Sequence, residues 1–452
     1  MENLTIFRAY DVRGIYGSDI TLETMTNIAR AFGTFMKQKS MDRITVGGDI
    51  RASTGTLLHA FISGLTSTGV SCDVVTTSPL GITLFNSFSK NYAASAFITA
   101  SHLPPEWNGV KFYWGVGIGF SPEENEEVKK IFIEKQFTTA DVFELGKVRF
   151  VDPYYDFVEY LRSKFAFSEE FKIAIDCGNG ATSVILPQLY KDLGFEVISI
   201  FDTPDPKFPN RPSEPNEESL KKLSEFVSQN QVTFAAGFDG DGDRCVFADE
   251  KGKVISADAF GIITARYLTK ELDNNRVIIN MECSLAMEKY LEDMNAEVKR
   301  IRVGHSFLSM EAKKMDAVMG VEASGHAIVP SVFLFDDALI LPLVFAKAIE
   351  NSEKQVSELV AEIKLPIKKR YDLPCSDETK FHKMKDVDAL LRTEEGKIAD
   401  VDGTSLTTPY GRILARVSNT SPKLRVTIES LSQEGYDKLE DKFLQKIKDL
   451  IK

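Results

Sequence analysis

Ser101 and His102 lie in a loop whose residue types could do covalent chemistry. A hydrophobic, strand-like run at 92–98 precedes them, and two prolines follow, which stop a strand and fix the shape of a loop. Loops held by a rigid scaffold commonly carry chemistry, so Ser101 is a candidate nucleophile and Lys111 a basic group ten residues further on. An ordinary surface loop is the alternative interpretation of this stretch alone.

Three aspartates, Asp239, Asp241 and Asp243, alternate with glycines between two strand-like runs. Carboxylates this close repel one another unless a cation lies among them, and oxygen ligands suit Mg²⁺ or Ca²⁺. An EF-hand is disfavoured, because Arg244 stands at the sixth position, where that loop needs glycine, and because the flanks are strands. The pattern predicts a divalent cation site, with a simple acidic turn as the alternative. Arg244 beside it could face an anionic phosphoryl group.

A polar turn near the C-terminus combines two arginines with short hydrogen-bonding side chains. Its members are Arg416, Ser418, Asn419, Thr420 and Arg425. Phosphate is commonly bound by guanidinium groups that form bidentate hydrogen bonds, together with short hydroxyl and amide donors. We therefore expect phosphate binding here, the alternative being a capped β-turn with exposed basic side chains.

Three of the five histidines, His102, His305 and His326, lie in polar turns that contain glycine or proline. One histidine in such a turn is commonly structural, whereas three in candidate loops favour a site. Glu322 and Ser324 stand just before His326 and could bind sugar hydroxyls. A helix-capping or turn role is the alternative for these two residues.

The elements that must position these residues alternate between strands and helices along most of the chain. Apolar residues recur at helical spacing in 21–39, and Ser-Pro-Glu-Glu at 121–124 predicts the start of another helix. We expect an α/β protein with three successive similar mixed α/β domains and a smaller C-terminal α+β domain around a central cleft. The predicted domains are residues 1–150, 151–253, 254–366 and 367–452.

A strand, a glycine turn and a helix at 171–183 are similar to half of a dinucleotide-binding fingerprint. The third glycine of that fingerprint is replaced by Ser183, and no acidic residue closes a clear strand about 20 positions later. The stretch therefore favours a structural strand-to-helix turn over nucleotide binding.

Composition narrows the possible functions. A net charge of −12 argues against general nucleic-acid binding, so an anionic ligand needs a local basic cluster. We expect no membrane span, because the sequence has no apolar run of 18 or more residues. We also expect no secretion signal, because the N-terminus lacks a basic stretch followed by an apolar one. The five cysteines are scattered and never form a Cys-x-x-Cys pair, which indicates reduced thiols in a cytoplasmic protein.

Together these motifs resemble, in order and over the whole chain, those of the α-D-phosphohexomutase superfamily, most closely its phosphomannomutase/phosphoglucomutase branch. One such motif is weak evidence for the superfamily, but six motifs in the correct order are very specific for it. The resemblance is carried by the runs 7–14, 99–111, 239–244, 303–306, 321–326 and 416–425.

The resemblance implies an enzyme that moves phosphate between the 1- and 6-positions of mannose or glucose, through phosphorylated Ser101 and a hexose 1,6-bisphosphate. Catalytic roles are implied for Ser101, His102, Lys111, Arg13 and Arg244. Mg²⁺ is implied on Ser101, Asp239, Asp241 and Asp243. Substrate contacts are implied for Tyr10, His305, Glu322, Ser324, His326, Arg416, Ser418, Asn419, Thr420 and Arg425.

Val321 and Ala323 depart from the family pattern in the segment thought to read the sugar, so a phosphoglucosamine mutase stays open. The runs 7–14 and 303–306 favour the mannose/glucose branch, and we expect hexose phosphates to be preferred. A metal-dependent phosphatase and an inactive phosphosugar-binding protein are further alternatives. The expected partner is a small sugar phosphate, for a monomer or homodimer. The C-terminal domain is expected to move as a rigid body about a hinge near 367–369.

Overall fold

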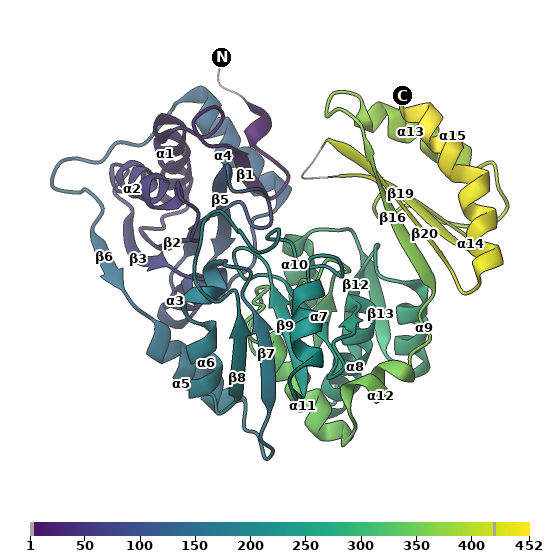
Figure 1. Ribbon diagram of the computed structural model, residues 1–452. Helices are drawn as coiled ribbons and strands as arrows, with labels where there is room; N and C mark the ends of the chain where they lie inside the picture. Colours follow the sequence, from purple (N-terminus) through teal and green to yellow (C-terminus); the bar gives the residue numbers. More distant parts are fainter. Residues whose placement is uncertain (1–3, 419–421) are drawn as a thin grey trace.

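The computed structural model describes residues 4–418 and 422–452 and contains four β-sheets that follow one another along the chain (Figure 1). The first three sheets are mixed and are flanked by helices, whereas the fourth is antiparallel. The expected fold is therefore confirmed: three mixed α/β domains precede a smaller α+β domain. The last domain, in green to yellow, stands apart at the upper right (Figure 1).

The first sheet has the strand order β1-β5-β4-β2-β3-β6. Its strands are β1 (Asp11–Ile15), β2 (Arg43–Gly48), β3 (Ser71–Thr77), β4 (Ala94–Ile98), β5 (Trp107–Trp114) and β6 (Val148–Val151). Its helices are the short η1 (Leu4–Ile6), α1 (Leu22–Gln38), α2 (Thr54–Thr66), α3 (Leu80–Lys90) and α4 (Pro122–Glu134).

The second sheet has the order β11-β10-β9-β7-β8 and the third β13-β12-β14-β15. The second region comprises α5 (Tyr154–Lys164), β7 (Lys172–Asp176), η2 (Ala181–Val184), α6 (Leu186–Asp192), β8 (Glu196–Ile200), α7 (Lys221–Ser228), β9 (Phe234–Phe238), β10 (Cys245–Ala248) and β11 (Val254–Ile255). The third comprises α8 (Ala257–Glu271), β12 (Arg276–Asn280), α9 (Leu285–Asp293), β13 (Glu297–Ile301), α10 (His305–Met315), β14 (Met319–Val321), β15 (Ala327–Ile328), α11 (Leu341–Ser352) and α12 (Val356–Ala361).

One four-strand arrangement recurs in all three mixed sheets. In each, two parallel strands flank a central one, and a fourth strand runs antiparallel to the third: β3-β2-β4-β5, β8-β7-β9-β10 and β13-β12-β14-β15. The internal repeat suggested by the strand–helix rhythm is thus a repeat of topology. The connection from the third to the fourth strand is the serine loop in the first sheet, the aspartate loop in the second and the Glu322–His326 turn in the third.

The predicted helix start at residue 121 is confirmed in atomic detail. Ser121 accepts a hydrogen bond from the backbone of Glu124, whose side chain accepts one in return from the Ser121 N–H. This capping box satisfies two backbone donors that the first helical turn would otherwise leave unpaired. It fixes where α4 begins, so the chain leaves β5 in a defined direction.

The glycine turn after β7 is built to fit its neighbours, which supports the structural interpretation. Gly178 has φ of +53°, and a Cβ there would lie 2.6 Å from the Arg211 guanidinium. Gly180 lies against the backbone of Gly240, whose carbonyl oxygen accepts a hydrogen bond from the Ala181 N–H at 2.9 Å. The turn therefore packs against the aspartate loop and is hydrogen-bonded to it.

A continuous hydrophobic core joins the first three domains. Phe85 of α3 packs against Phe157 of α5 and Phe333 of the third domain, with ring centroids 5.1 and 6.0 Å apart. Phe345 of α11 packs on Phe234 of β9 at 5.3 Å. Burying each such ring contributes about 1.5–3 kcal/mol relative to leaving it exposed. The shared core holds the three repeated connections in fixed relative positions.

The C-terminal domain has a separate core between one face of its sheet and its helices. The sheet order is β16-β20-β19-β18-β17. Its elements are β16 (Ile367–Pro374), α13 (Lys380–Leu391), β17 (Lys397–Ala399), β18 (Thr404–Thr408), β19 (Gly411–Val417), β20 (Lys423–Ser430), α14 (Gln433–Leu439), the π-helical η3 (Glu440–Leu444) and α15 (Gln445–Ile451).

The structure narrows where a hinge near residues 367–369 could lie. Residues 367–369 are the first residues of β16 and pair with residues 428–430 of β20. Lys368 also binds Asp258 of α8, with Nζ 2.9 Å from Oδ2. Because a strand paired along its length resists bending, the connection that can act as a hinge is residues 362–366, between α12 and β16.

Composition predicts no membrane span and reduced cysteines. Within residues 4–418 and 422–452, the helices are all too short or too polar to cross a membrane. All five cysteines are buried and carry free thiols.

Candidate active site

The three repeated connections converge on one place. Ser101 Oγ, from the first domain, lies 3.3 Å from Asp239 Oδ2 of the second. Asp243 Oδ1, from the same aspartate loop, lies 3.8 Å from His326 Nδ1 of the third. Because equivalent connections sit at equivalent edges of their sheets, the repeat itself places these groups at a common cleft.

Ser101 is held in an uncommon backbone conformation. Its φ is +53°, in the left-handed region that residues other than glycine rarely enter. Its N–H donates to Thr99 Oγ1 at 2.8 Å, and its Oγ lies 3.3 Å from His102 Nδ1. The turn directs the hydroxyl toward the aspartate loop, which is where a nucleophile must point if the carboxylates hold a cation.

Arg51, which the motifs above do not include, fixes the shape of the serine loop. Its guanidinium donates to four carbonyl oxygens at 2.6–3.0 Å, those of Ser101, Leu103, Pro104 and Trp107. Its Nε also pairs with Asp49 Oδ2 at 3.1 Å, and both side chains are buried. Arg51 replaces the strand partners that these carbonyls lack.

Antiparallel pairing of β1 with β5 gathers three charges on one face. Asp11 lies opposite Lys111 in the register, and Arg13 follows two positions later on the same side. Arg13 pairs with Asp11 at 2.6 Å, while its Nε and Nη1 have no hydrogen-bond partner among the described residues. Arg13 therefore retains unused donors at the cleft, as an anionic ligand would require.

The aspartate loop is a tight turn wrapped around one carboxylate. Asp239 Oδ1 accepts backbone hydrogen bonds from residues 242, 243 and 244 at 2.9–3.2 Å. Asp239, Asp241 and Asp243 are buried and each offers an oxygen within 4.8 Å of the others. Asp241 Oδ1 and Asp243 Oδ1 have no hydrogen-bond partner among the described residues. This set of buried oxygens fits a Mg²⁺-like cation.

Lys111 already neutralises part of this cluster. Its Nζ lies 2.9 Å from Asp241 Oδ2 and also contacts Asp243 Oδ2. Burial and the neighbouring carboxylates raise the pKa of Asp239 well above its usual range. Burial alone would also raise the pKa of Asp243, but Lys111, His326 and Arg244 outweigh it and hold that pKa well below its usual value.

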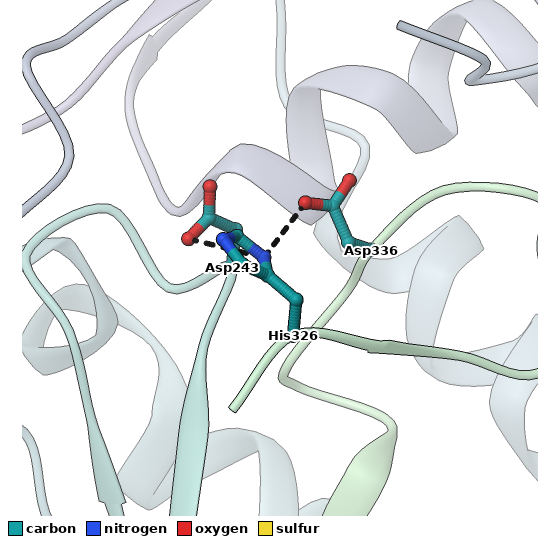
Figure 2. A group of neighbouring side chains, drawn as sticks. All are labelled: Asp243, His326 and Asp336. Carbon is teal, nitrogen blue, oxygen red and sulfur yellow. Dashed lines mark ion pairs between the residues drawn. The ribbon is translucent and has the colours of Figure 1, made fainter. Parts of the chain in front are cut away.

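His326 links the second and third domains (Figure 2). Its Nε2 accepts a hydrogen bond from Arg244 Nε at 2.9 Å, and its Nδ1 lies 2.9 Å from Asp336 Oδ2. Burial lowers the pKa of His326, but Asp243 and the bonded Asp336 outweigh burial and raise it. Asp336 was missed by sequence reasoning, because an aspartate ten residues after a histidine has no recognisable spacing.

His305 and Tyr10 form an aromatic wall beside His326. The His305 ring stacks on that of His326 with centroids 6.1 Å apart and lies edge-on to Tyr10 at 6.0 Å. Burial lowers the pKa of His305, which favours the neutral ring. Gly304 has φ of +147°, and a Cβ there would lie 2.7 Å from the Tyr10 ring, so this approach requires glycine.

Glu322 is held at the opening of the same turn. Its Oε1 accepts from the Gly304 N–H at 2.8 Å, and its Oε2 accepts from Ser324 Oγ at 3.2 Å. His102, the third candidate histidine, lies beside Ser101, and burial together with Arg244 and Arg13 places its pKa well below the usual value. These side chains present acceptors and a neutral ring to a polar ligand.

The opposite end of the cleft is basic and comes from the fourth domain. Arg416 and Arg425 are register partners on β19 and β20, and both line the pocket with Ser418. Asn419 and Thr420 lie outside the described residues. Arg370 of β16 joins this group, although sequence analysis did not single it out. Arg416 is buried and pairs with Glu282 of the third domain, with Nε 2.7 Å from Oε1.

One pocket contains most of the predicted site residues. They are Tyr10, Arg13, Ser101, His102, Lys111, Asp243, Arg244, His305, Glu322, Ser324, His326, Arg416, Ser418 and Arg425. Asp239 and Asp241 lie behind Ser101 and Lys111 rather than on the pocket wall. The lining residues that sequence analysis missed are Asp11, Glu214, Glu282, Val303, Gly304 and Arg370. Of these, Glu214, Glu282 and Arg370 are charged, but the residues that they face in the pocket are distant in sequence.

Comparison with known proteins gives matches along the whole chain. Residues 4–139, 152–252 and 256–365 match the phosphoglucomutase/phosphomannomutase alpha/beta/alpha domains I, II and III, and residues 373–446 match the C-terminal domain of the same family. A protein of Pyrococcus abyssi named "Probable phosphoglucosamine mutase" is 30% identical over 449 residues, covering 99% of this chain and 98% of that protein. One of Thermococcus kodakarensis named "Phosphoglucomutase/phosphomannomutase" is 33% identical, with 95% of each chain covered.

A solved structure has the same fold. The phosphoglucomutase/phosphomannomutase family protein of Burkholderia thailandensis superimposes with a TM-score of 0.90 at 23% identity, over 100% of this chain and 98% of that one. The family's members are mutases that move a phosphoryl group within a sugar phosphate. The chain belongs to the phosphoglucomutase/phosphomannomutase family of the α-D-phosphohexomutase superfamily.

Proposed function

We propose that this protein interconverts the 1-phosphate and 6-phosphate of a hexose through phosphorylated Ser101, and that glucosamine phosphate is its preferred substrate. The observation that carries the chemistry is the meeting of Ser101, the aspartate loop and the Glu322–His326 turn at equivalent connections of three repeats. An arginine cluster faces them from the fourth domain. A nucleophile, a cation site, a sugar-binding wall and a phosphate site therefore share one pocket.

In the proposed reaction the phosphate on Ser101 passes to the free hydroxyl of the bound sugar phosphate, giving a 1,6-bisphosphate. The bisphosphate turns within the cleft and returns its other phosphate to Ser101. Arg416 and Arg425 hold the phosphate that is not reacting, in both orientations. Because the same arginines bind the non-reacting phosphate in both half-reactions, a single site can act on either end of the sugar.

Positive groups of this chain would stabilise the negative charge of the transferring group. Arg244 and the unused donors of Arg13 point to the cleft beside Ser101. Asp239, Asp241 and Asp243 would hold Mg²⁺ together with the phosphoserine, and the ion when bound would stabilise charge on the phosphoryl oxygens. Lys111 and Arg13 are also placed to exchange a proton with a sugar hydroxyl.

The comparisons favour the amino sugar over the hexoses that sequence analysis preferred. The Pyrococcus abyssi relative, which this chain covers almost completely, carries the name of a phosphoglucosamine mutase. An ammonium on the sugar adds a positive charge, and the pocket offers carboxylates such as Glu322 and Glu214 to receive it. The Thermococcus kodakarensis relative supports mannose or glucose as the second candidate.

A coupled assay tests the proposal directly. Purified protein is given glucosamine 1-phosphate, mannose 1-phosphate or glucose 1-phosphate with Mg²⁺ and a trace of the matching 1,6-bisphosphate. We expect each substrate that reacts to be converted to its 6-phosphate. The value of kcat/KM should be highest for glucosamine 1-phosphate. Release of inorganic phosphate without isomer would identify a phosphatase instead, and absence of both products an inactive binding protein.

A further inference from the structure

Glu282 places a negative charge inside the arginine cluster that is expected to hold phosphate. It lies in the turn between β12 and α9, where its N–H donates to Asn280 Oδ1 at 3.0 Å. Its carboxylate Oε1 accepts from Arg416 Nε at 2.7 Å and also contacts Nη2. Glu282 is buried and lines the pocket, so it occupies donors that a ligand would otherwise use.

The charged state of Glu282 follows from its surroundings. Burial alone would raise its pKa, but Arg416, Arg425 and Arg370 outweigh burial and lower the pKa to about 2. Those three arginines come from three strands of the fourth domain, while the glutamate comes from the third. The carboxylate is therefore ionised throughout the neutral range and faces the same groups that a phosphate would face.

We propose that Glu282 competes with the substrate's phosphate for Arg416 and thereby sets how tightly the non-reacting phosphate is held. The proposal rests on the function proposed above, because only a mutase must hold and release phosphate at this site twice in each cycle. In the empty pocket Glu282 keeps Arg416 ordered and neutralised. A bound phosphate has to share or displace that contact, so its affinity is limited.

Local charge supports this role. Glu282 lines the pocket beside the three guanidinium groups. Asp372, which contacts Arg370 and Arg425, and Asp402, which lies 3.9 Å from Arg416, do not line it. Removing the charge of Glu282 would therefore add one net positive charge facing phosphate in a buried setting, where screening by salt is weak. A dianion would then bind more tightly and leave more slowly.

A neighbouring ion pair offers a matched control. Arg412 of β19 pairs with Glu429 of β20, with Nε 2.9 Å from Oε1, and both are buried at the same contact between the third and fourth domains. Glu429 Oε1 also accepts from the Leu285 N–H at 2.9 Å. Glu429 does not line the phosphate pocket. A change at Glu429 therefore disturbs the domain contact without altering the charge that faces phosphate.

The test measures binding of inorganic phosphate to the full-length protein by isothermal titration calorimetry. Binding that disappears in Arg416→Gln is assigned to the arginine cluster. We expect this binding to be about five- to tenfold tighter in Glu282→Gln and in Glu282→Ala, whereas Glu429→Gln should stay within about twofold of the unmodified protein. Equal or weaker binding in both Glu282 variants would overturn the proposal, as would equal tightening in Glu429→Gln.

Kinetics with the preferred sugar phosphate give a second readout. If Glu282 limits affinity, KM and kcat should both fall in Glu282→Gln, because tighter binding slows reorientation and release. A lower kcat with an unchanged or higher KM would instead indicate a purely structural role and contradict the proposal. Absence of turnover in the unmodified protein would count against the proposed function, while the calorimetric comparison would still decide the role of Glu282.

Discussion

Lys111 Nζ, on a strand of the first domain, lies 2.9 Å from Asp241 Oδ2, in the aspartate loop of the second. The two side chains are buried, so this contact ties the strand that follows the serine loop to the aspartate loop. A lysine in this position supplies charge that a divalent cation would also supply. Lys111 can therefore offset part of the negative charge of the aspartate loop when no metal ion is bound.

This relationship predicts that metal and Lys111 support the loop together. In Lys111→Gln, the buried carboxylates lose their cation, and the free energy of unfolding should fall by about 3 kcal/mol in chelator. Added Mg²⁺ should restore part of this loss, whereas it should change the unmodified protein much less. Urea unfolding with chelator or with Mg²⁺ measures both effects. Lys289→Gln, which removes an exposed lysine on α9, is the control and should respond to Mg²⁺ as the unmodified protein does.

Ser101 is predicted to carry the transferable phosphate. Intact-mass analysis should show one phosphate on at least part of the protein and none on Ser101→Ala. Turnover in that variant should fall by at least about a thousandfold, because the group that accepts and donates phosphate is gone. Ser324→Ala, which removes a hydroxyl from the Glu322–His326 turn, should keep the phosphate. Normal turnover of Ser101→Ala with bisphosphate present would rule out the phosphoserine mechanism.

Much of the fold could be predicted from sequence, because local patterns determine it. Hydrophobic spacing and caps gave the helix at 22–38 and the helix start at 122 within a residue or two. The strand–helix rhythm indicated three similar domains, but the order of strands within each sheet is a tertiary property. Motifs located the serine, aspartate and glutamate–histidine connections, and the structure explains why they belong together.

Sequence reasoning missed three residues that act through partners elsewhere in the chain. Glu282 is recognisable only once Arg416, in another domain, lies beside it. Asp336 shows its role only through His326, and Arg51 only through the carbonyl groups that it binds in the serine loop. A single acidic or basic residue has no characteristic spacing, so no pattern in the sequence could separate these from solvent-exposed charges.

The Glu282–Arg416 pair also predicts how stability depends on pH. The pKa of Glu282 is about 2 in the folded protein, below its ordinary value of 4.5. As the pH falls, Glu282 therefore takes up a proton in the unfolded chain before it does so in the folded protein. The stabilisation is fully present above pH 4.5 and is lost progressively toward pH 2. Lowering the pH from 6 to 3 should therefore reduce the free energy of unfolding by on the order of 2 kcal/mol through this group. Glu282→Gln should lose correspondingly less over the same range, measured by urea unfolding; equal slopes would contradict the assignment.

The C-terminal domain is predicted to close on substrate as a rigid body, pivoting at residues 362–366. Its separate core permits such motion, and its arginines must leave the cleft for the sugar to enter and turn. Small-angle scattering should therefore show a more compact particle with sugar phosphate than without. Arg416→Ala should weaken substrate binding by about 1.5–3 kcal/mol, because a charge-assisted contact is lost. It should leave phosphate on Ser101, which belongs to another domain. An unchanged scattering profile, together with an unchanged KM in Arg416→Ala, would show that this domain neither closes nor holds phosphate.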